Sequence, residues 1–272
     1  MTPEVTEILG SPAAPSTERR TRLARLNIKP LDFTLPKALE ATEPPEARGK
    51  ARDEIKLLVS FRSDNHVEHA AFRDLPRYLN AGDVLVINTS GTMPAALNVH
   101  RADGRLLELH LSTHLPGDLW TVEARLPGES AEKGTKPFFD SVQGETLALP
   151  GGGLATLHIP YRQDRTIPEP APARLWIASL SLPLALPEYL AAYGFPIRYG
   201  YVKHSWPISY YQNVYATEVG SAEMPSSGRA FTPALLDALR ARKVEIAPLI
   251  LHCGVASLED HEPPYEEYYR VP

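Results

Sequence analysis

The sequence lacks several features, and each absence excludes a class of protein. Its 272 residues include a single cysteine, Cys253, so no disulfide can form within the chain. The best apolar run, 175–186, contains serines and a proline and is shorter than the about 18–20 residues that cross a bilayer. Residues 1–28 are polar and contain prolines, which predicts a disordered tail and not a signal peptide. We therefore expect a cytoplasmic monomer with no membrane contact.

Charge and short motifs exclude further classes. The formal net charge of −5 argues against sequence-independent binding of nucleic acid over the whole surface, although a local basic patch could still hold an RNA. Zinc-like spacing of His, Cys, Asp and Glu is absent, as are a phosphate-binding glycine loop and a GxSxG nucleophile elbow. We therefore expect no metal site.

The middle of the chain has the pattern of a β-rich domain. Residues 106–111, 120–126 and 154–159 each alternate between apolar and polar side chains, as half-buried strands do. Asp103-Gly104 lies between two strand-like runs and predicts a hairpin turn. Regular short strands with glycine-rich turns, such as 151–153, predict a small barrel or sandwich.

A helix and a strand are predicted near the end of the chain. Thr232 can cap a helix over 233–243. Pro233 suits its first position, because the N–H that proline lacks would have no partner within the helix there. The apolar run 244–251 has the length of a strand and leads into His252-Cys253-Gly254. Another buried strand is predicted at 84–88. Ligands bind at the carboxyl ends of strands in open α/β sheets, so the chemistry is expected near His252.

These segments carry a family resemblance. The segments are LDFTLP (31–36), RDEIKLLV (52–59), FRDLP (72–76), GDVLVINT (82–89), YQNVYA (211–216), PSSGRAF (225–231) and LHCG (251–254). In this order they resemble the motifs of the S-adenosylmethionine:tRNA ribosyltransferase-isomerases of queuosine biosynthesis. The resemblance implies an α/β (α+β) domain formed by 29–82 and 179–272, with a small β-barrel domain inserted at 83–178.

The resemblance also implies a reaction. The family moves the ribosyl moiety of S-adenosylmethionine to 7-aminomethyl-7-deazaguanine in tRNA and isomerises it, which gives epoxyqueuosine with loss of adenine and methionine. S-adenosylmethionine would be a co-substrate, and no cofactor is expected. The expected partners are S-adenosylmethionine and a tRNA that carries 7-aminomethyl-7-deazaguanine.

Candidate site residues follow from the resemblance and from side-chain chemistry. His252 is the candidate for proton transfer, because imidazole titrates near neutrality, and Asp53 is a second candidate. The expected substrate-binding residues are Asn88, Thr89, Arg198, Tyr211, Gln212, Tyr215, Pro225, Ser226, Ser227, Gly228, Phe231 and Gly254. For each of them a packing or turn role is the alternative.

The departures from the family pattern leave two other functions open. Ser90 and Ala96 stand where the family has arginines, Arg229-Ala230 replace the Leu-His of its GLHF motif, and 255–266 also differ. The family pattern continues for about one strand-helix unit beyond Pro272, which suggests a truncated or shortened member. One alternative is a divergent enzyme that uses S-adenosylmethionine on a small-molecule acceptor. The other is a catalytically inactive paralogue that acts as a binding or scaffold protein.

Overall fold

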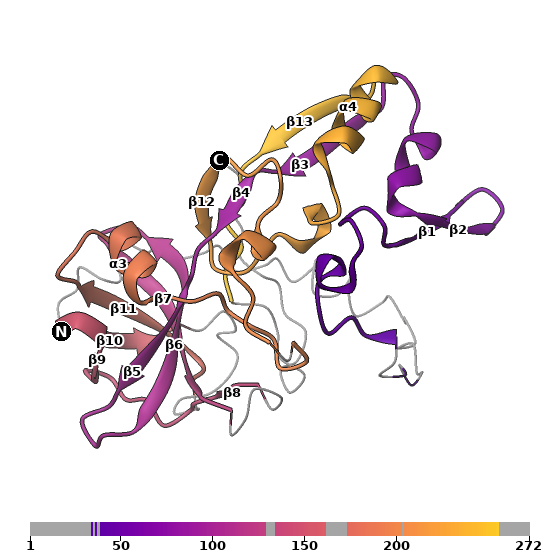
Figure 1. Ribbon diagram of the computed structural model, residues 1–272. Helices are drawn as coiled ribbons and strands as arrows, with labels where there is room; N and C mark the ends of the chain where they lie inside the picture. The colour runs from indigo at the N-terminus through magenta and orange to yellow at the C-terminus, as the bar shows by residue number, and fades with distance from the viewer. Residues whose placement is uncertain are drawn as a thin grey trace, which may run out of the picture.

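The structure is a computed structural model that describes residues 34, 36, 39–128, 134–161, 173–202 and 204–255 (Figure 1). The expected tail at 1–28 and the altered segment 256–266 lie outside these residues. Within the described part of the chain, no helix is long and apolar enough to cross a bilayer.

Six antiparallel strands close into a barrel (Figure 1). β11 pairs with β10 on one side and with β7 on the other, from Leu175 opposite Glu123 to Ser179 opposite Leu119, which closes the ring. A short strand, β8, extends the far end of β7. The predicted strands at 106–111, 120–126 and 154–159 are therefore confirmed. The strands are β5 (Ala96–His100), β6 (Leu106–Leu115), β7 (Leu119–Leu126), β8 (Lys136–Pro137), β9 (Thr146–Ala148), β10 (Leu154–Pro160) and β11 (Leu175–Ser181).

The barrel encloses the larger apolar core. Leu107, Leu109 and Leu111 of β6 alternate into it and are fully buried. The helix α3 (Leu186–Tyr193) covers one end of the barrel and buries Tyr189, whose hydroxyl donates to the carbonyl of Pro150. Pro150 begins the glycine-rich turn η4 (Pro150–Gly152) between β9 and β10, as the sequence predicted.

The parallel strands outside the barrel form two separate pairs. β3 (Val84–Asn88) pairs with β13 (Glu245–Leu249), and β4 (Ser90–Thr92) pairs with β12 (Glu218–Ser221). Figure 1 shows β4 and β12 between the barrel and the β3–β13 pair. The expected open α/β sheet is thus, in the described residues, two small parallel pairs.

The helix α4 (Pro233–Ala241) covers β3 and β13. Thr232 caps it as predicted, since its hydroxyl accepts a hydrogen bond from the Leu235 amide at 3.1 Å. The helix ends at Ala241 and not at 243, because Lys243 has a φ of 62°, in the left-handed region. Its apolar side packs with η3 (Phe72–Tyr78) in a second core.

The strands β1 (Lys56–Ser60) and β2 (Val67–Ala71) form an antiparallel hairpin that leads into η3 and lies at the end of the molecule opposite the barrel (Figure 1). A short 3₁₀ turn, η2 (Pro45–Arg48), precedes the hairpin. Two more such turns, η5 (Ile208–Tyr211) and η6 (Ser226–Gly228), belong to the loops that join the barrel to α4.

The barrel strands do not coincide with the expected limits 83–178, because they begin later and end later. The barrel strands begin at Ala96, because Val84–Thr92 pair with β13 and β12 instead. At the other end, β11 reaches Ser181 and α3 packs onto the barrel core. The division into domains itself remains a prediction.

Candidate functional site

The carboxyl ends of β3 and β13 meet β4 and β12 at a place that we call the strand junction, formed by Asn88, Ser90, Gly220, Ser221 and His252. Asn88 organises it, because its Nδ2 donates to the Leu251 carbonyl at 2.7 Å and its Oδ1 accepts from the Leu251 amide at 3.0 Å. Its Oδ1 also accepts from the Ser90 amide at 3.1 Å. These bonds hold the chain after β13 against the end of β3. The strand stops at Leu249 and not at 251, because its partner β3 ends at Asn88, opposite Leu249.

His252 lies in the strand junction with about two fifths of its side chain exposed. Its Nδ1 is 2.7 Å from the Ser90 hydroxyl, and its Nε2 is 3.6 Å from a carboxylate oxygen of Glu218. The ring lies against Gly220, where an added Cβ would be 2.6 Å from both ring nitrogens. A side chain at position 220 would therefore displace the imidazole.

The residues after His252 join the strand junction to the barrel. Gly254 lies so close to β6 that an added Cβ would be 2.5 Å from the Ser112 hydroxyl, which also accepts from the Val255 amide at 2.8 Å. Burial raises the pKa of the Cys253 thiol. A protonated thiol is a poor nucleophile, so the half-buried Cys253 has the character of a small packing side chain.

The PSSGRAF motif forms the 3₁₀ turn η6 and the start of α4. Gly228 is buried there, and an added Cβ would clash with the Tyr215 hydroxyl and the Asn213 amide. Pro225 is held by its carbonyl, which accepts from Nδ2 of Asn213 at 3.0 Å. Ser226 is exposed, as is Ser227, and neither hydroxyl has a hydrogen-bond partner within the described residues. These two hydroxyls are the polar groups of the motif that a ligand could reach.

Several predicted binding residues have structural partners instead. Gln212 pairs with the backbone of Thr92, accepting from its amide at 2.9 Å and donating to its carbonyl at 2.7 Å. Phe231 is buried and packs edge-on against Phe72, with ring centroids 5.1 Å apart. Tyr215 also packs edge-on against Phe231, with ring centroids 5.9 Å apart. Substrate contact at these residues stays a prediction.

Two more candidates lie among backbone and packing contacts. The amide of Thr89, a buried residue, donates to the Leu249 carbonyl at 2.8 Å, which continues the β3–β13 pairing. Asp53 lies at the start of α4, where it accepts from the Thr232 hydroxyl at 3.3 Å and lies 3.8 Å from Arg73. Asp53 and His252 thus have different partners, and the structure describes no hydrogen bond or ion pair between them.

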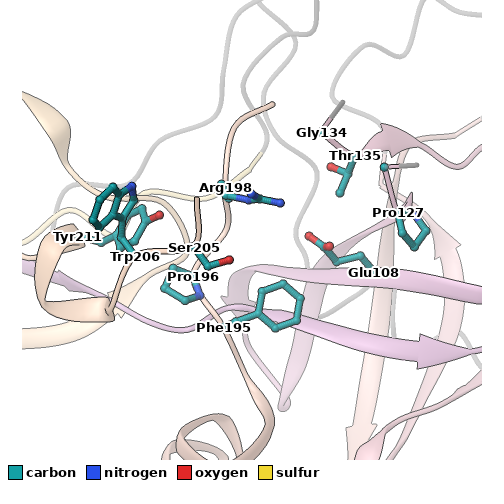
Figure 2. Close-up of a pocket in the computed structure, with 11 residues that line it drawn as sticks. Glu108, Pro127, Gly134, Thr135, Phe195, Pro196, Arg198, Ser205, Trp206 and Tyr211 are labelled. Atoms are coloured by element: carbon teal, nitrogen blue, oxygen red, sulfur yellow. The ribbon is translucent and has the colours of Figure 1, made fainter. Parts of the chain in front are cut away.

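A cavity of 310 Å³ opens between the barrel and the segment 195–211 (Figure 2). Arg198 and Tyr211 line it, and they are the two predicted binding residues that do so. In Figure 2 the Arg198 guanidinium and the Glu108 carboxylate both point toward the space between the two walls. The cavity therefore offers both signs of charge beside the aromatic rings of Trp206 and Tyr211.

Sequence reasoning missed several residues of these sites. On β12, Glu218 lies 3.6 Å from His252 and Ser221 bonds to Ser90, which contacts the imidazole, yet the segment that contains them has no pattern that marks it as functional. Glu108 and Trp206 line the cavity, but Glu108 reads as a polar position of a barrel strand. Within the described ranges, no cluster of His, Cys, Asp and Glu could hold a metal ion.

Comparison with known proteins identifies the family. A model of a family described as queuosine biosynthesis protein matches residues 28–272. The chain belongs to this family. An S-adenosylmethionine:tRNA ribosyltransferase-isomerase of Thermotoga maritima is 31% identical over 256 residues, which cover 91% of this chain and 68% of the relative. The enzyme of the same name from Moorella thermoacetica is 33% identical over 259 residues, covering 90% and 68%.

A solved structure is also similar in sequence. The crystal structure of S-adenosylmethionine tRNA ribosyltransferase from Thermotoga maritima matches at 22% identity, over 83% of this chain and 59% of that chain. The TM-score is 0.30, so no argument about fold rests on this match. The chain spans less than two thirds of that solved chain. The family match over residues 28–272 nevertheless confirms the resemblance that the motifs indicated.

Proposed function

We propose that this chain transfers the ribosyl moiety of S-adenosylmethionine to 7-aminomethyl-7-deazaguanine in tRNA and isomerises it, with release of adenine and methionine. The observation that carries the proposal is the family match over residues 28–272, together with relatives that are named for this reaction. S-adenosylmethionine is a co-substrate here and no cofactor takes part. The enzyme is a transferase and isomerase of tRNA modification.

The reaction needs groups that move protons. A base removes a proton beside the sulfonium, and the departing adenine takes up a proton or a hydrogen bond. His252 suits a role at one of these steps, because it is half exposed at the strand junction while Ser90 fixes its ring. Asp53 is the second candidate, and its carboxylate lies beside the amino end of α4, where the helix dipole favours negative charge.

The two substrates need different surfaces. Ser226 and Ser227 present unpaired hydroxyls that can bond the ribose or carboxylate oxygens of S-adenosylmethionine. The cavity suits the modified base, because Trp206 and Tyr211 offer rings for stacking and Glu108 offers a carboxylate to the exocyclic amine. Arg198 at the same cavity can meet a phosphate of the tRNA.

The test is release of adenine, measured by chromatography. The purified chain is incubated with S-adenosylmethionine and with tRNA that carries 7-aminomethyl-7-deazaguanine, with unmodified tRNA, or with the free base alone. Adenine release that depends on the modified tRNA supports the proposal. Release with the free base alone identifies a small-molecule acceptor, and binding of S-adenosylmethionine in calorimetry without any release identifies an inactive binding protein. Either of the last two results overturns the proposal.

A variant pair locates the chemistry. His252→Ala is expected to lower adenine release at least about tenfold if the imidazole acts in the reaction. His158→Ala is the matched control, because His158 is a hydrogen-bonded histidine on a barrel strand, paired with Ser179 at 2.8 Å. A loss smaller than tenfold in His252→Ala would remove this residue from the mechanism.

A further inference from the structure

Three side chains in the strand junction form one continuous chain of hydrogen bonds. The Ser221 and Ser90 hydroxyl oxygens are 2.6 Å apart, and the Ser90 oxygen is 2.7 Å from Nδ1 of His252. The amide of Cys253 donates to the Ser221 oxygen at 2.9 Å. Both serines are buried, Ser221 completely and Ser90 to 1% exposure, so water does not replace these partners.

The hydrogen bonds can run in two directions, because a hydroxyl oxygen has two lone pairs and the Ser221 oxygen accepts from the Cys253 amide in either case. In the first direction the Ser221 hydroxyl donates to the Ser90 oxygen, and the Ser90 hydroxyl donates to Nδ1 of His252. Both hydroxyl protons then have a strong acceptor, and the proton of the neutral imidazole lies on Nε2.

The reverse arrangement leaves a buried group without a good partner. If Nδ1 carried the proton, it would donate to Ser90, and Ser90 would donate to Ser221. The Ser221 hydroxyl proton would then turn to the Cys253 thiol, with which Ser221 interacts, and sulfur is a weak acceptor. A buried donor without an acceptor is costly, so the first arrangement is favoured.

We propose that Ser90 and Ser221 are positioning residues that hold neutral His252 in the tautomer protonated on Nε2. His252 then presents a hydrogen-bond donor, and not a basic nitrogen, on the exposed side of its ring where Glu218 lies 3.6 Å away. This role rests on the proposed function: the Nε2–H of His252 would donate a hydrogen bond to the leaving adenine or to a ribosyl oxygen. Another group would then abstract the proton beside the sulfonium. A neutral imidazole can polarise such an atom without full proton transfer.

The test reads the tautomer directly, in the full chain without substrate. Protein labelled with ¹⁵N at histidine is studied by two-bond ¹H–¹⁵N correlation at a pH where the His252 ring is neutral. We expect the wild-type spectrum to show the proton on Nε2. A wild-type spectrum with the proton on Nδ1, or with both tautomers equally populated, would overturn the proposal.

Three variants sharpen the result. Ser90→Ala removes the donor to Nδ1 and should leave a mixture of tautomers, whereas Ser221→Ala leaves Nδ1 as the acceptor of the Ser90 hydroxyl proton and should keep the ring proton on Nε2. Ser179→Ala is the matched control, because it removes the hydroxyl that pairs with His158 on the barrel and should leave His252 unchanged. An unchanged tautomer in Ser90→Ala would mean that Ser90 does not set the tautomer, and a rise of the Nδ1-protonated form in Ser221→Ala would overturn the direction assigned to the hydrogen bonds.

An activity measurement separates this inference from the proposed function. If adenine release occurs, Ser90→Ala should lower kcat about tenfold with little change in KM, since only the ring orientation is lost. An Nε2-protonated wild type without adenine release would leave the tautomer assignment intact and overturn only the proposed function. An unchanged kcat in Ser90→Ala would overturn the positioning role of Ser90.

Discussion

The barrel and the region of the parallel strand pairs achieve stability in different ways. The barrel closes on itself through the β7–β11 pairing and encloses a large core that includes Leu97, Leu109 and Leu157, all fully buried. The parallel region has a core of five buried residues, and Val84 and Val86 on the other face of β3 are 58% and 61% exposed. The strand junction therefore lies on the less well-packed part of the molecule.

Pairs of hydrogen bonds from side-chain amides to distant backbone segments, which we call side-chain brackets, compensate for this sparse packing. Two-stranded sheets are marginal by themselves, and parallel pairing is slightly weaker per residue than antiparallel pairing. Here the amides of Asn88 and Gln212 each make two hydrogen bonds to the backbone of a distant segment. Such brackets fix loop geometry at the strand junction, while the barrel provides the rigid support. Functional residues are commonly found on the less stable parts of folds.

The largest effect is expected from a substitution that removes a buried charge in the barrel. Glu123 is 1% exposed and pairs with Arg125 and with Arg174, the latter at 3.4 Å. Glu123→Gln leaves both guanidinium groups without their carboxylate, which should lower the free energy of unfolding by about 3–5 kcal/mol. Urea unfolding followed by tryptophan fluorescence measures this, since Trp120 and Trp176 belong to the barrel core. Exposed Glu188→Gln on α3 should have almost no effect, and equal effects would show that the cluster is not the source.

The next comparison uses two leucines of equal burial. Leu109 in the barrel and Leu239 in α4 are both 0% exposed, so truncation to alanine should cost each about 2–4 kcal/mol. The consequences should differ in extent. Leu239→Ala should increase hydrogen exchange in α4, β3 and β13 while the barrel amides stay protected, whereas Leu109→Ala should weaken protection throughout the barrel. Uniform loss of protection in both variants would mean that the two regions unfold as one unit.

A smaller effect is expected at the turn before α4. Gly228→Ala places a methyl group against the Tyr215 hydroxyl and 2.6 Å from Nδ2 of Asn213, which should cost about 1–3 kcal/mol. Tyr215→Phe removes one of the two obstacles, so the alanine should cost less in that background. Thermal unfolding of the four proteins in this double-mutant cycle measures the coupling, and additive effects would contradict the contact.

Local patterns predicted the elements, but not how they meet. Alternation identified the barrel strands, and the Thr232 cap with the following leucines identified α4, because these signals lie within a few residues of one another. The pairing of Ser90 with Ser221 joins residues 131 positions apart, and nothing in either segment indicates its partner. Sequence therefore located His252 as a candidate, and the structure was needed to find the groups that orient it.

The replacements in the family motifs illustrate the same limit. From the sequence, Arg229 counted as the loss of a motif, since the family has Leu-His where this chain has Arg-Ala. In the structure its guanidinium donates to both oxygens of Glu46, at 2.9 and 2.8 Å, and to the Tyr210 carbonyl at 2.8 Å. The arginine thus ties η2 and η5 to the start of α4. A contact over 183 positions could not be inferred from either segment alone.

The smallest effect is expected at the ion pair between Glu46 and Arg229, whose contribution to stability should depend on pH. Burial opposes ionisation of Glu46, but hydrogen bonds and the positive charges of Arg229 and Arg52 lower its pKa below the usual 4.5. A lowered pKa means that the ionised carboxylate stabilises the fold above pH 4.5, and that this contribution is lost as the pH falls through the lowered value. Glu46→Gln should therefore cost about 1 kcal/mol at pH 7 and progressively less in acid, in urea unfolding at several pH values.

The control for this series is Glu245→Gln on β13, an exposed carboxylate for which the structure describes no ion pair. It should show little effect at any pH. A cost of Glu46→Gln that stayed constant into acid would mean that the residue acts through packing, and that charge does not hold the parallel region together. A cost that vanishes in acid would instead show that the ion pair between Glu46 and Arg229 helps to hold η2 and η5 to the start of α4.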